Sequence, residues 1–134
     1  MPSGDEGTIG LRVFHKELAE AVTAKFGTRC PCCGDAMLHG RPRKKNATAQ
    51  NRRDRASVAH DVPVSMGGNA EVWLWACRGC NSDQGAMSFL SWSCRLALDG
   101  DGRAERVGRL AAFIEAWTAA HGVPRRFSRR GNRA

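Results

Sequence analysis

Two short cysteine pairs, CPCC at positions 30–33 and CRGC at positions 77–80, decide which fold this chain of 134 residues can adopt. Each pair has the C-x-x-C spacing that places two thiolates on one metal ion, because the backbone amides of the turn fold back toward the sulfurs. Zinc in structural sites takes four tetrahedral ligands, so the pairs predict one zinc ion held by Cys30, Cys33, Cys77 and Cys80. Such a clamp fixes both ends of the intervening segment and contributes folding free energy directly.

Cys32 and Cys94 remain outside these pairs. Cys32 is an alternative ligand to Cys30 or Cys33, although the order of the CPCCG segment favours the latter two. Two other interpretations stay open: four ordinary buried thiols, or a redox-active pair, for which the βαβ context of thioredoxin-like proteins is missing. Paired cysteines in a chain without a secretion signal indicate bound metal more than disulfides, so we expect a reducing, cytoplasmic compartment.

The composition fits one compact α+β domain. The chain is 42% hydrophobic, and it contains no apolar run long enough to predict a transmembrane helix. Its first ten residues are polar and acidic, which predicts no signal peptide, and we expect no membrane partner. We predict a disordered leader at 1–10, one domain at 11–121, and a basic, disordered tail at 122–134.

Apolar periodicity and turn residues predict the elements of this domain. We expect a helix at 11–26, two antiparallel strands at 57–62 and 72–76, and a short helix at 78–84. Ser88 is the expected cap of a further helix that reaches Leu98, and a last helix is expected at 103–120. The residues expected to face inward on the first and last helices are Leu11, Phe14, Leu18, Val22, Phe26, Val107, Leu110, Ile114 and Trp117.

The net charge of +8 is concentrated in two segments, because residues 41–55 sum to +6 and residues 125–134 to +5. Local basicity of this kind is typical of a surface that meets phosphate. For residues 41–55 we favour contact with the DNA backbone over a plain solvated loop, because this segment leads directly into the strand that carries His60. For residues 125–134 a solvated tail is favoured, which is compatible with DNA contact.

Between the cysteine pairs lies VAHDVPVSMGG at 58–68, and VWLWACRGCNSDQG follows at 72–85. With CPCCG, these segments resemble, in order and spacing, the zinc-containing HNH endonucleases of phages and mobile elements. The resemblance covers residues 30–85. It implies a ββα-metal module that hydrolyses DNA phosphodiester bonds. Helices flank this module on both sides, and residues 86–121 form its helical C-terminal extension. It further implies a catalytic Mg²⁺ or Mn²⁺ beside the zinc, and phage packaging or other nucleic-acid-processing proteins as partners.

By this resemblance, His60 is the general base that activates water and Asn81 binds the catalytic cation. An unperturbed histidine titrates near pH 6.5, which suits a base that works near neutral pH. Asn69 is the nearest counterpart of the middle asparagine of the family, and Asp61 is a candidate for the catalytic acid. The expected nucleic-acid-binding residues are Arg43, Lys44, Lys45, Arg52, Arg53 and Arg78.

The chain departs from the family pattern at Ala59, where the family carries a metal-binding acid before the histidine. Asp61 does not simply replace that acid, since adjacent strand residues point to opposite faces unless the strand bulges. Gln84 stands where a lysine is common. The alternative function is therefore a non-catalytic zinc-knuckle protein that binds DNA on a degenerate HNH fold, and a third is a structural adaptor.

The four tryptophans invite two interpretations. Trp73 and Trp75 share one face of the second predicted strand, where core packing is favoured over base stacking. Trp92 and Trp117 are expected in the core.

Overall fold

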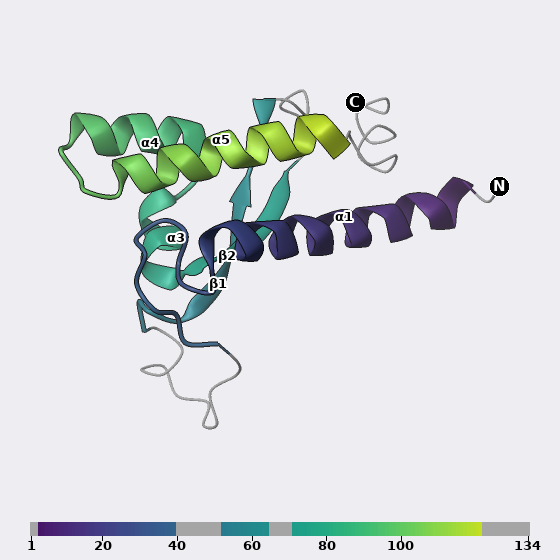
Figure 1. Ribbon diagram of the computed structural model, residues 1–134, viewed down its shortest axis with the longest axis horizontal. Helices are drawn as coiled ribbons and strands as arrows, with labels where there is room; N and C mark the ends of the chain where they lie inside the picture. The colour runs from purple at the N-terminus through teal and green to yellow at the C-terminus, as the bar shows by residue number, and fades with distance from the viewer. Residues whose placement is uncertain (1–2, 40–51, 65–70, 122–134) are drawn as a thin grey trace.

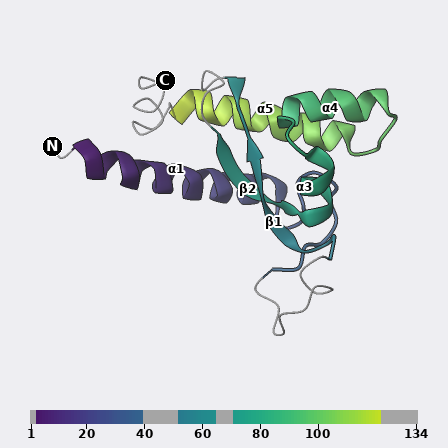
Figure 2. The same cartoon turned by 180° about the vertical axis from the view of Figure 1, so that it is seen from behind.

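The computed structural model describes residues 3–39, 52–64 and 71–121, with side chains from residue 14 onward. In these ranges the elements are α1 (Ser3–Phe26), β1 (Ala56–Asp61), β2 (Val72–Cys77), α3 (Arg78–Gln84), α4 (Phe89–Leu98) and α5 (Ala104–His121). β1 and β2 form a two-stranded antiparallel sheet in which His60 pairs with Trp73. The helices α4 and α5 lie side by side next to one end of this hairpin, and α1 runs past β2 (Figures 1 and 2). The predicted α+β class is confirmed.

The predicted elements between the second cysteine pair and α5 are confirmed. α3 spans Arg78–Gln84 and ends at Gly85, whose φ of 59° lies in the left-handed region that favours glycine. Ser88 caps α4, because its hydroxyl accepts the backbone N–H of Ser91 at 3.1 Å. These caps explain why two helices that are close in sequence remain separate.

α1 begins at Ser3 and not near Leu11, so the helix includes residues 3–10 of the predicted leader. No proline occurs between Ser3 and Phe26 to interrupt the helix. Farther along, α1 packs against α5, and Phe14 meets Trp117 with ring centroids 5.1 Å apart. The predicted tail at 122–134 lies outside the described residues. None of the described helices is long and apolar enough to cross a membrane.

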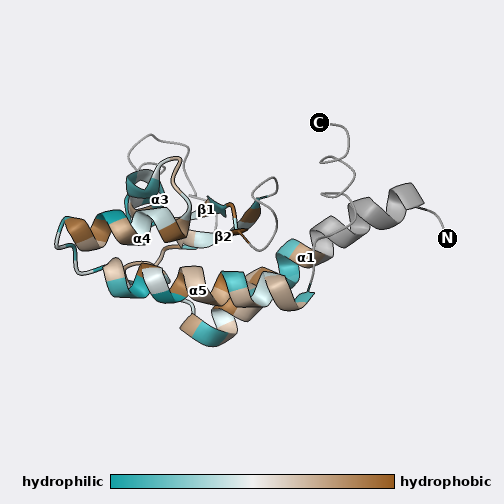
Figure 3. Ribbon diagram, turned by 90° about the horizontal axis from the view of Figure 1, so that it is seen from above, coloured by the Kyte–Doolittle hydropathy of each residue, from teal (hydrophilic) through white to brown (hydrophobic). Residues whose placement is uncertain are grey.

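The core lies between the hairpin, α1 and the α4–α5 pair. Burial alternates along β2 from Val72 to Ala76, with Val72, Leu74 and Ala76 buried, and Cys77 at the end of the strand is buried as well. These side chains belong to one apolar cluster with residues from the three long helices, namely Phe14, Leu18, Val22, Phe89, Trp92, Leu96, Val107, Leu110 and Ile114. Around α5 apolar and polar residues alternate, as expected for a helix with one buried face (Figure 3).

The favoured prediction for Trp73 and Trp75 is wrong, because they are 46% and 49% exposed. The buried face of β2 is already filled by the smaller residues at the alternate positions, so both indoles project from the opposite face. Trp92 is 2% exposed, as predicted, and Trp117 is only partly buried against the core.

Candidate metal centre and histidine site

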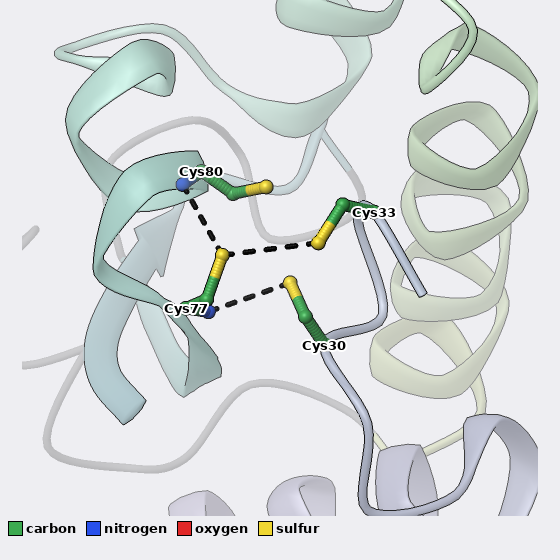
Figure 4. A group of neighbouring side chains, drawn as sticks. All are labelled: Cys30, Cys33, Cys77 and Cys80. Carbon is green, nitrogen blue, oxygen red and sulfur yellow. Dashed lines mark hydrogen bonds between the residues drawn. The ribbon is translucent and has the colours of Figure 1, made fainter. Parts of the chain in front are cut away.

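Four thiols converge where the first cysteine pair meets the end of β2 (Figure 4). The Sγ atoms of Cys30, Cys33, Cys77 and Cys80 all lie within 4.8 Å of one another. The Sγ atoms of Cys33 and Cys77 are 3.8 Å apart. Tetrahedral zinc with Zn–S bonds of about 2.3 Å requires sulfurs about 3.8 Å from each other. The cluster can therefore hold a structural metal ion such as zinc.

Local backbone geometry builds both halves of this cluster. In the first half, the Gly34 N–H donates to the Cys30 carbonyl at 2.8 Å, and Gly34 adopts a φ of 80° that a side chain would strain. In the second half, Cys77 caps α3, and its Sγ accepts the Cys80 N–H at 3.4 Å. The Cys77 N–H in turn donates to the Cys30 Sγ at 3.4 Å, which joins the two halves. Such N–H···S contacts favour thiolates.

The pKa values of the neighbouring thiols depend on one another. Hydrogen bonds from Cys32 and Cys80 hold the pKa of Cys30 far below its usual range, whereas donating to Cys30 raises the pKa of Cys32 and of Cys80. Burial raises the pKa of Cys33 to about 12. Without a cation the cluster thus favours one thiolate, and the positive charge of a bound metal ion would stabilise the others.

The two remaining cysteines do not belong to the ligand quartet. Cys32 is fully buried next to Cys30, but the four converging thiols are the predicted ones, which supports Cys30 and Cys33 as the first pair. Cys94 is exposed on α4.

Arg103, which the sequence did not single out, reaches the metal centre from the start of α5. Its Nη1 lies 3.6 Å from the Cys80 Sγ and 2.9 Å from the Asp83 carboxylate. Its guanidinium also pairs with Asp101 and lies 5.2 Å from the ring centroid of Trp92. A four-thiolate zinc site carries net negative charge, so this partly buried cation would stabilise it and tie it to α5.

Two amide side chains fix α3 to β1. The Asn81 Nδ2 donates to the Ser57 Oγ at 3.0 Å and to the Val58 carbonyl at 3.1 Å. Since a backbone carbonyl only accepts, the nitrogen of this amide must face the strand. The carboxamide oxygen of Asn81 is then the atom that remains for a metal ion. Gln84 donates from Nε2 to the carbonyls of His60 and Met87, both at 2.8 Å.

His60 presents its imidazole to solvent on the outer face of the hairpin. Its side chain is 51% exposed, and its ring stacks on Trp73 with centroids 5.5 Å apart. Its Nδ1 lies 3.9 Å from the Oε2 of Glu71, a residue that the sequence reading did not select. His15 of α1 stacks on the same indole at 4.8 Å, and burial lowers the pKa of His15. Aromatic contacts and a carboxylate therefore hold the His60 ring.

The structure does not bring all predicted site residues together. Ala59 and Asp61 face the core, whereas His60 faces out. The Asp61 carboxylate accepts the Phe89 N–H at 2.8 Å, and burial raises the pKa of Asp61. Among the described residues the side chains of His60 and Asn81 form no hydrogen bond with each other, although His60 lies on β1 and the Asn81 amide donates to Ser57 and Val58 of the same strand. Asn69, Arg43, Lys44 and Lys45 lie outside the described residues.

The described arginines of the predicted DNA-binding set differ in their partners. Arg52 pairs with Asp54 at 2.8 Å, and Arg53 pairs with Asp83 at 3.0 Å. Arg78 is exposed at the first position of α3 and pairs with no carboxylate in the described part of the chain. Arg78 is thus the member of this set whose charge is most available to a phosphate.

The fit to a catalytic cation is weaker than the fit to zinc. Within the described ranges, the four thiols are the only group of three or more His, Cys, Asp or Glu residues placed to share a metal ion. No family model matches the chain, and no curated protein or solved structure shows significant similarity to it. The functional interpretation therefore depends on the residues and their geometry.

Proposed function

We propose that this chain is a metal-dependent endonuclease of the HNH type that hydrolyses DNA phosphodiester bonds, with His60 as the general base. The observation that carries the proposal is the position of His60, an exposed imidazole on a strand held by α3 and by a thiol cluster suited to zinc. This arrangement of hairpin, helix and clamp agrees with the resemblance of residues 30–85 to that family. A cytoplasmic location is proposed from the paired cysteines, and nucleic-acid-processing partners are proposed from the same resemblance.

The proposed chemistry begins with a water molecule beside the His60 ring. When Nδ1–H points toward the Glu71 carboxylate, Nε2 carries the lone pair that accepts the proton of this water. The water oxygen attacks phosphorus, the bond from phosphorus to the 3′ oxygen breaks, and solvent protonates the leaving oxygen. Glu71 acts as a positioning residue, because it biases the tautomer without touching the substrate.

A catalytic Mg²⁺ or Mn²⁺, when bound, would offset negative charge on the phosphate. Ala59 supplies no ligand, and the buried Asp61 carboxylate accepts a hydrogen bond from the Phe89 N–H. The described residues therefore do not form a complete set of metal ligands. The Asn81 carboxamide oxygen is the available protein ligand, and Mg²⁺ commonly completes its octahedron with water and substrate phosphates. Weak metal binding in the absence of DNA is the consequence.

One observation favours a second function, a zinc-knuckle protein that binds DNA without cutting it. Ala59, which precedes His60 on β1, stands where the family has its metal ligand. The carboxylate of Asp61, on the other side of His60, accepts the Phe89 N–H at the start of α4. Arg78 and the basic segment 41–55 would still bind phosphate in such a protein.

Conversion of supercoiled plasmid to nicked or linear DNA separates these functions. Zinc-loaded protein is assayed with Mg²⁺, Mn²⁺ or Ni²⁺ and without added metal, because a chelator would also remove zinc. His60→Ala tests the base, Asn81→Ala tests the metal ligand, and His121→Ala, an exposed histidine on α5, is the matched control. The nuclease proposal expects metal-dependent cutting that His60→Ala abolishes and His121→Ala preserves.

Salt-dependent DNA binding without cutting in any metal would refute the nuclease and support the second function. If the wild-type protein neither binds nor cuts DNA, both proposals are wrong, and a structural role for the zinc site remains.

A further inference from the structure

The outer face of the hairpin and the adjacent face of α1 enclose an apolar groove of about 660 Å³. Its main lining residues are Lys16, Ala19, Thr23, Val58, Trp73 and Trp75, and we call it the aromatic groove. This volume lies within the range of about 300–1,000 Å³ that is typical of small-ligand sites. Trp73 and Trp75 are 46% and 49% exposed, and neighbouring exposed apolar side chains of this kind mark interaction sites.

The aromatic groove continues toward the first cysteine pair. A smaller hollow of about 60 Å³ shares Ala19, Thr23 and Trp75 with it, and extends to Arg29 and His39. Trp75 therefore lies where the two spaces meet, and its indole is 49% exposed. The groove has an apolar floor that Lys16 and Glu20 also line, and Arg29 lines the adjoining hollow.

The two indoles differ in what already covers them. Trp73 has His15 at 4.8 Å and His60 at 5.5 Å, both in stacked geometry. Trp75 has no stacked aromatic partner among the described residues, and its neighbour across the hairpin is the small side chain of Val58. Trp73 thus holds the His60 ring, whereas Trp75 remains available to stack with a ligand.

We propose that the aromatic groove binds unpaired bases of single-stranded DNA, with Trp75 as the stacking residue. The inference rests on the proposed function and names its substrate form. An aromatic floor with Lys16 beside it and Arg29 in the adjoining hollow suits a strand whose bases stack while its phosphates meet positive charge, and a duplex would offer no free base face. The net charge of +8, which comes from residues 41–55 and 125–134, attracts a polyanion to the chain as a whole, and Lys16 and Arg29 are the described Lys and Arg residues that line the groove and the adjoining hollow. Since Trp73 joins the groove to His60, a strand held there lies next to the proposed base.

The test compares fluorescein-labelled oligothymidine with an abasic strand of equal length, by anisotropy at fixed salt. Trp75→Ala should weaken oligothymidine binding about tenfold and leave abasic binding unchanged, because only the former loses base stacking. Trp75→Phe should retain most of the affinity. Lys16→Glu should weaken both ligands, since it acts on the phosphates. Leu98→Ala, an exposed apolar residue on α4 outside the groove, is the control and should change neither.

Zinc content and thermal unfolding of each variant establish that it is folded, and Val58→Glu provides a second probe of the groove floor that spares the indole. Equal oligothymidine affinity for wild-type protein, Trp75→Ala and Val58→Glu would overturn the inference. The inference would also be overturned if the wild-type protein formed a concentration-dependent dimer and the Trp75→Ala variant did not, because the groove would then bind a second copy of the chain. If plasmid cutting persists in either case, the inference about the groove fails while the proposed nuclease function stands. Failure of the inference can therefore be distinguished from failure of the proposed function.

Discussion

The side-chain nitrogen of Gln84 lies 2.8 Å from the main-chain oxygen of His60, and this hydrogen bond joins α3 to the strand that carries the exposed imidazole. Gln84 is 1% exposed, and its second amide hydrogen serves the Met87 carbonyl, also at 2.8 Å. Both donors of one buried amide are thus used between three segments: β1, α3 and the turn before α4. The residue that replaces a lysine of the HNH pattern has a structural role here, and it fixes the backbone at His60.

Replacing Gln84 tests this role. Gln84→Ala leaves two carbonyls without their donor and should lower the free energy of unfolding by about 1–3 kcal/mol. Gln84→Glu keeps the shape but turns a carboxylate toward the same carbonyls, so it should destabilise at least as much at neutral pH. Denaturant unfolding measures both, with Ser82→Ala on the exposed side of α3 as control. Wild-type stability of Gln84→Glu would contradict the assigned contacts.

The thiol cluster predicts which cysteines matter for metal binding. Cys77→Ser removes a ligand that also caps α3, so the variant should lose zinc and most of its cooperative unfolding transition. Cys94→Ser, exposed on α4, should retain one zinc per chain. Cys32→Ser should also retain the metal, because Cys32 stands outside the quartet. Metal analysis of purified proteins decides this, and zinc loss in Cys32→Ser with retention in Cys33→Ser would reverse the ligand assignment.

Asp61 predicts a pH dependence of stability. Burial raises the pKa of its carboxyl group in the folded state, so the folded chain holds this proton more tightly than the unfolded chain. The stability due to this group is fully present below the unfolded pKa of about 3.9 and is lost as the pH rises through the folded pKa. Asp61→Asn retains an oxygen that accepts the Phe89 N–H but does not titrate.

The unfolding free energy of wild-type protein minus that of Asp61→Asn should therefore fall from acidic to neutral pH. Zinc ligands titrate in both proteins, so their contribution cancels in this difference. A difference that rises with pH would mean that the Asp61 carboxylate is stabilised and not penalised by its surroundings.

Glu71 is expected to affect turnover and not DNA affinity. Glu71→Gln removes the carboxylate 3.9 Å from the His60 Nδ1, which should slow cutting several-fold, because the tautomer with a lone pair on Nε2 is then no longer favoured. Glu17→Gln on the exposed side of α1 is the matched control. A lower unfolding temperature or a matching loss of DNA affinity in Glu71→Gln would indicate a structural effect of Glu71 and not a positioning one.

Much of the backbone could be predicted from the sequence because its signals are local. The C-x-x-C spacing specifies two thiolates per turn, the alternation at 72–77 specifies a strand, and Ser88 specifies a helix start. Each of these depends on residues only a few positions apart. The extent of α1 could not be predicted, since residues 3–10 carry no clear apolar period and include three glycines, which disfavour a helix.

The arrangement of the site depends on tertiary contacts that leave no local pattern. Both faces of β2 are apolar, so periodicity alone does not show whether the tryptophans or Val72, Leu74 and Ala76 are buried; the packing of the helices decides it. Glu71 reaches His60 only through the register of the hairpin. Arg103 reaches Cys80 only because α5 packs beside the metal centre.

The most direct test of the proposed nuclease is single-turnover DNA cutting by zinc-loaded His60→Ala, with and without added imidazole. Loss of a general base predicts a rate about 10²–10⁴-fold below wild type at unchanged DNA affinity, with part of the rate restored by imidazole. Cutting by His60→Ala at the wild-type rate would contradict the central role of His60 in this site.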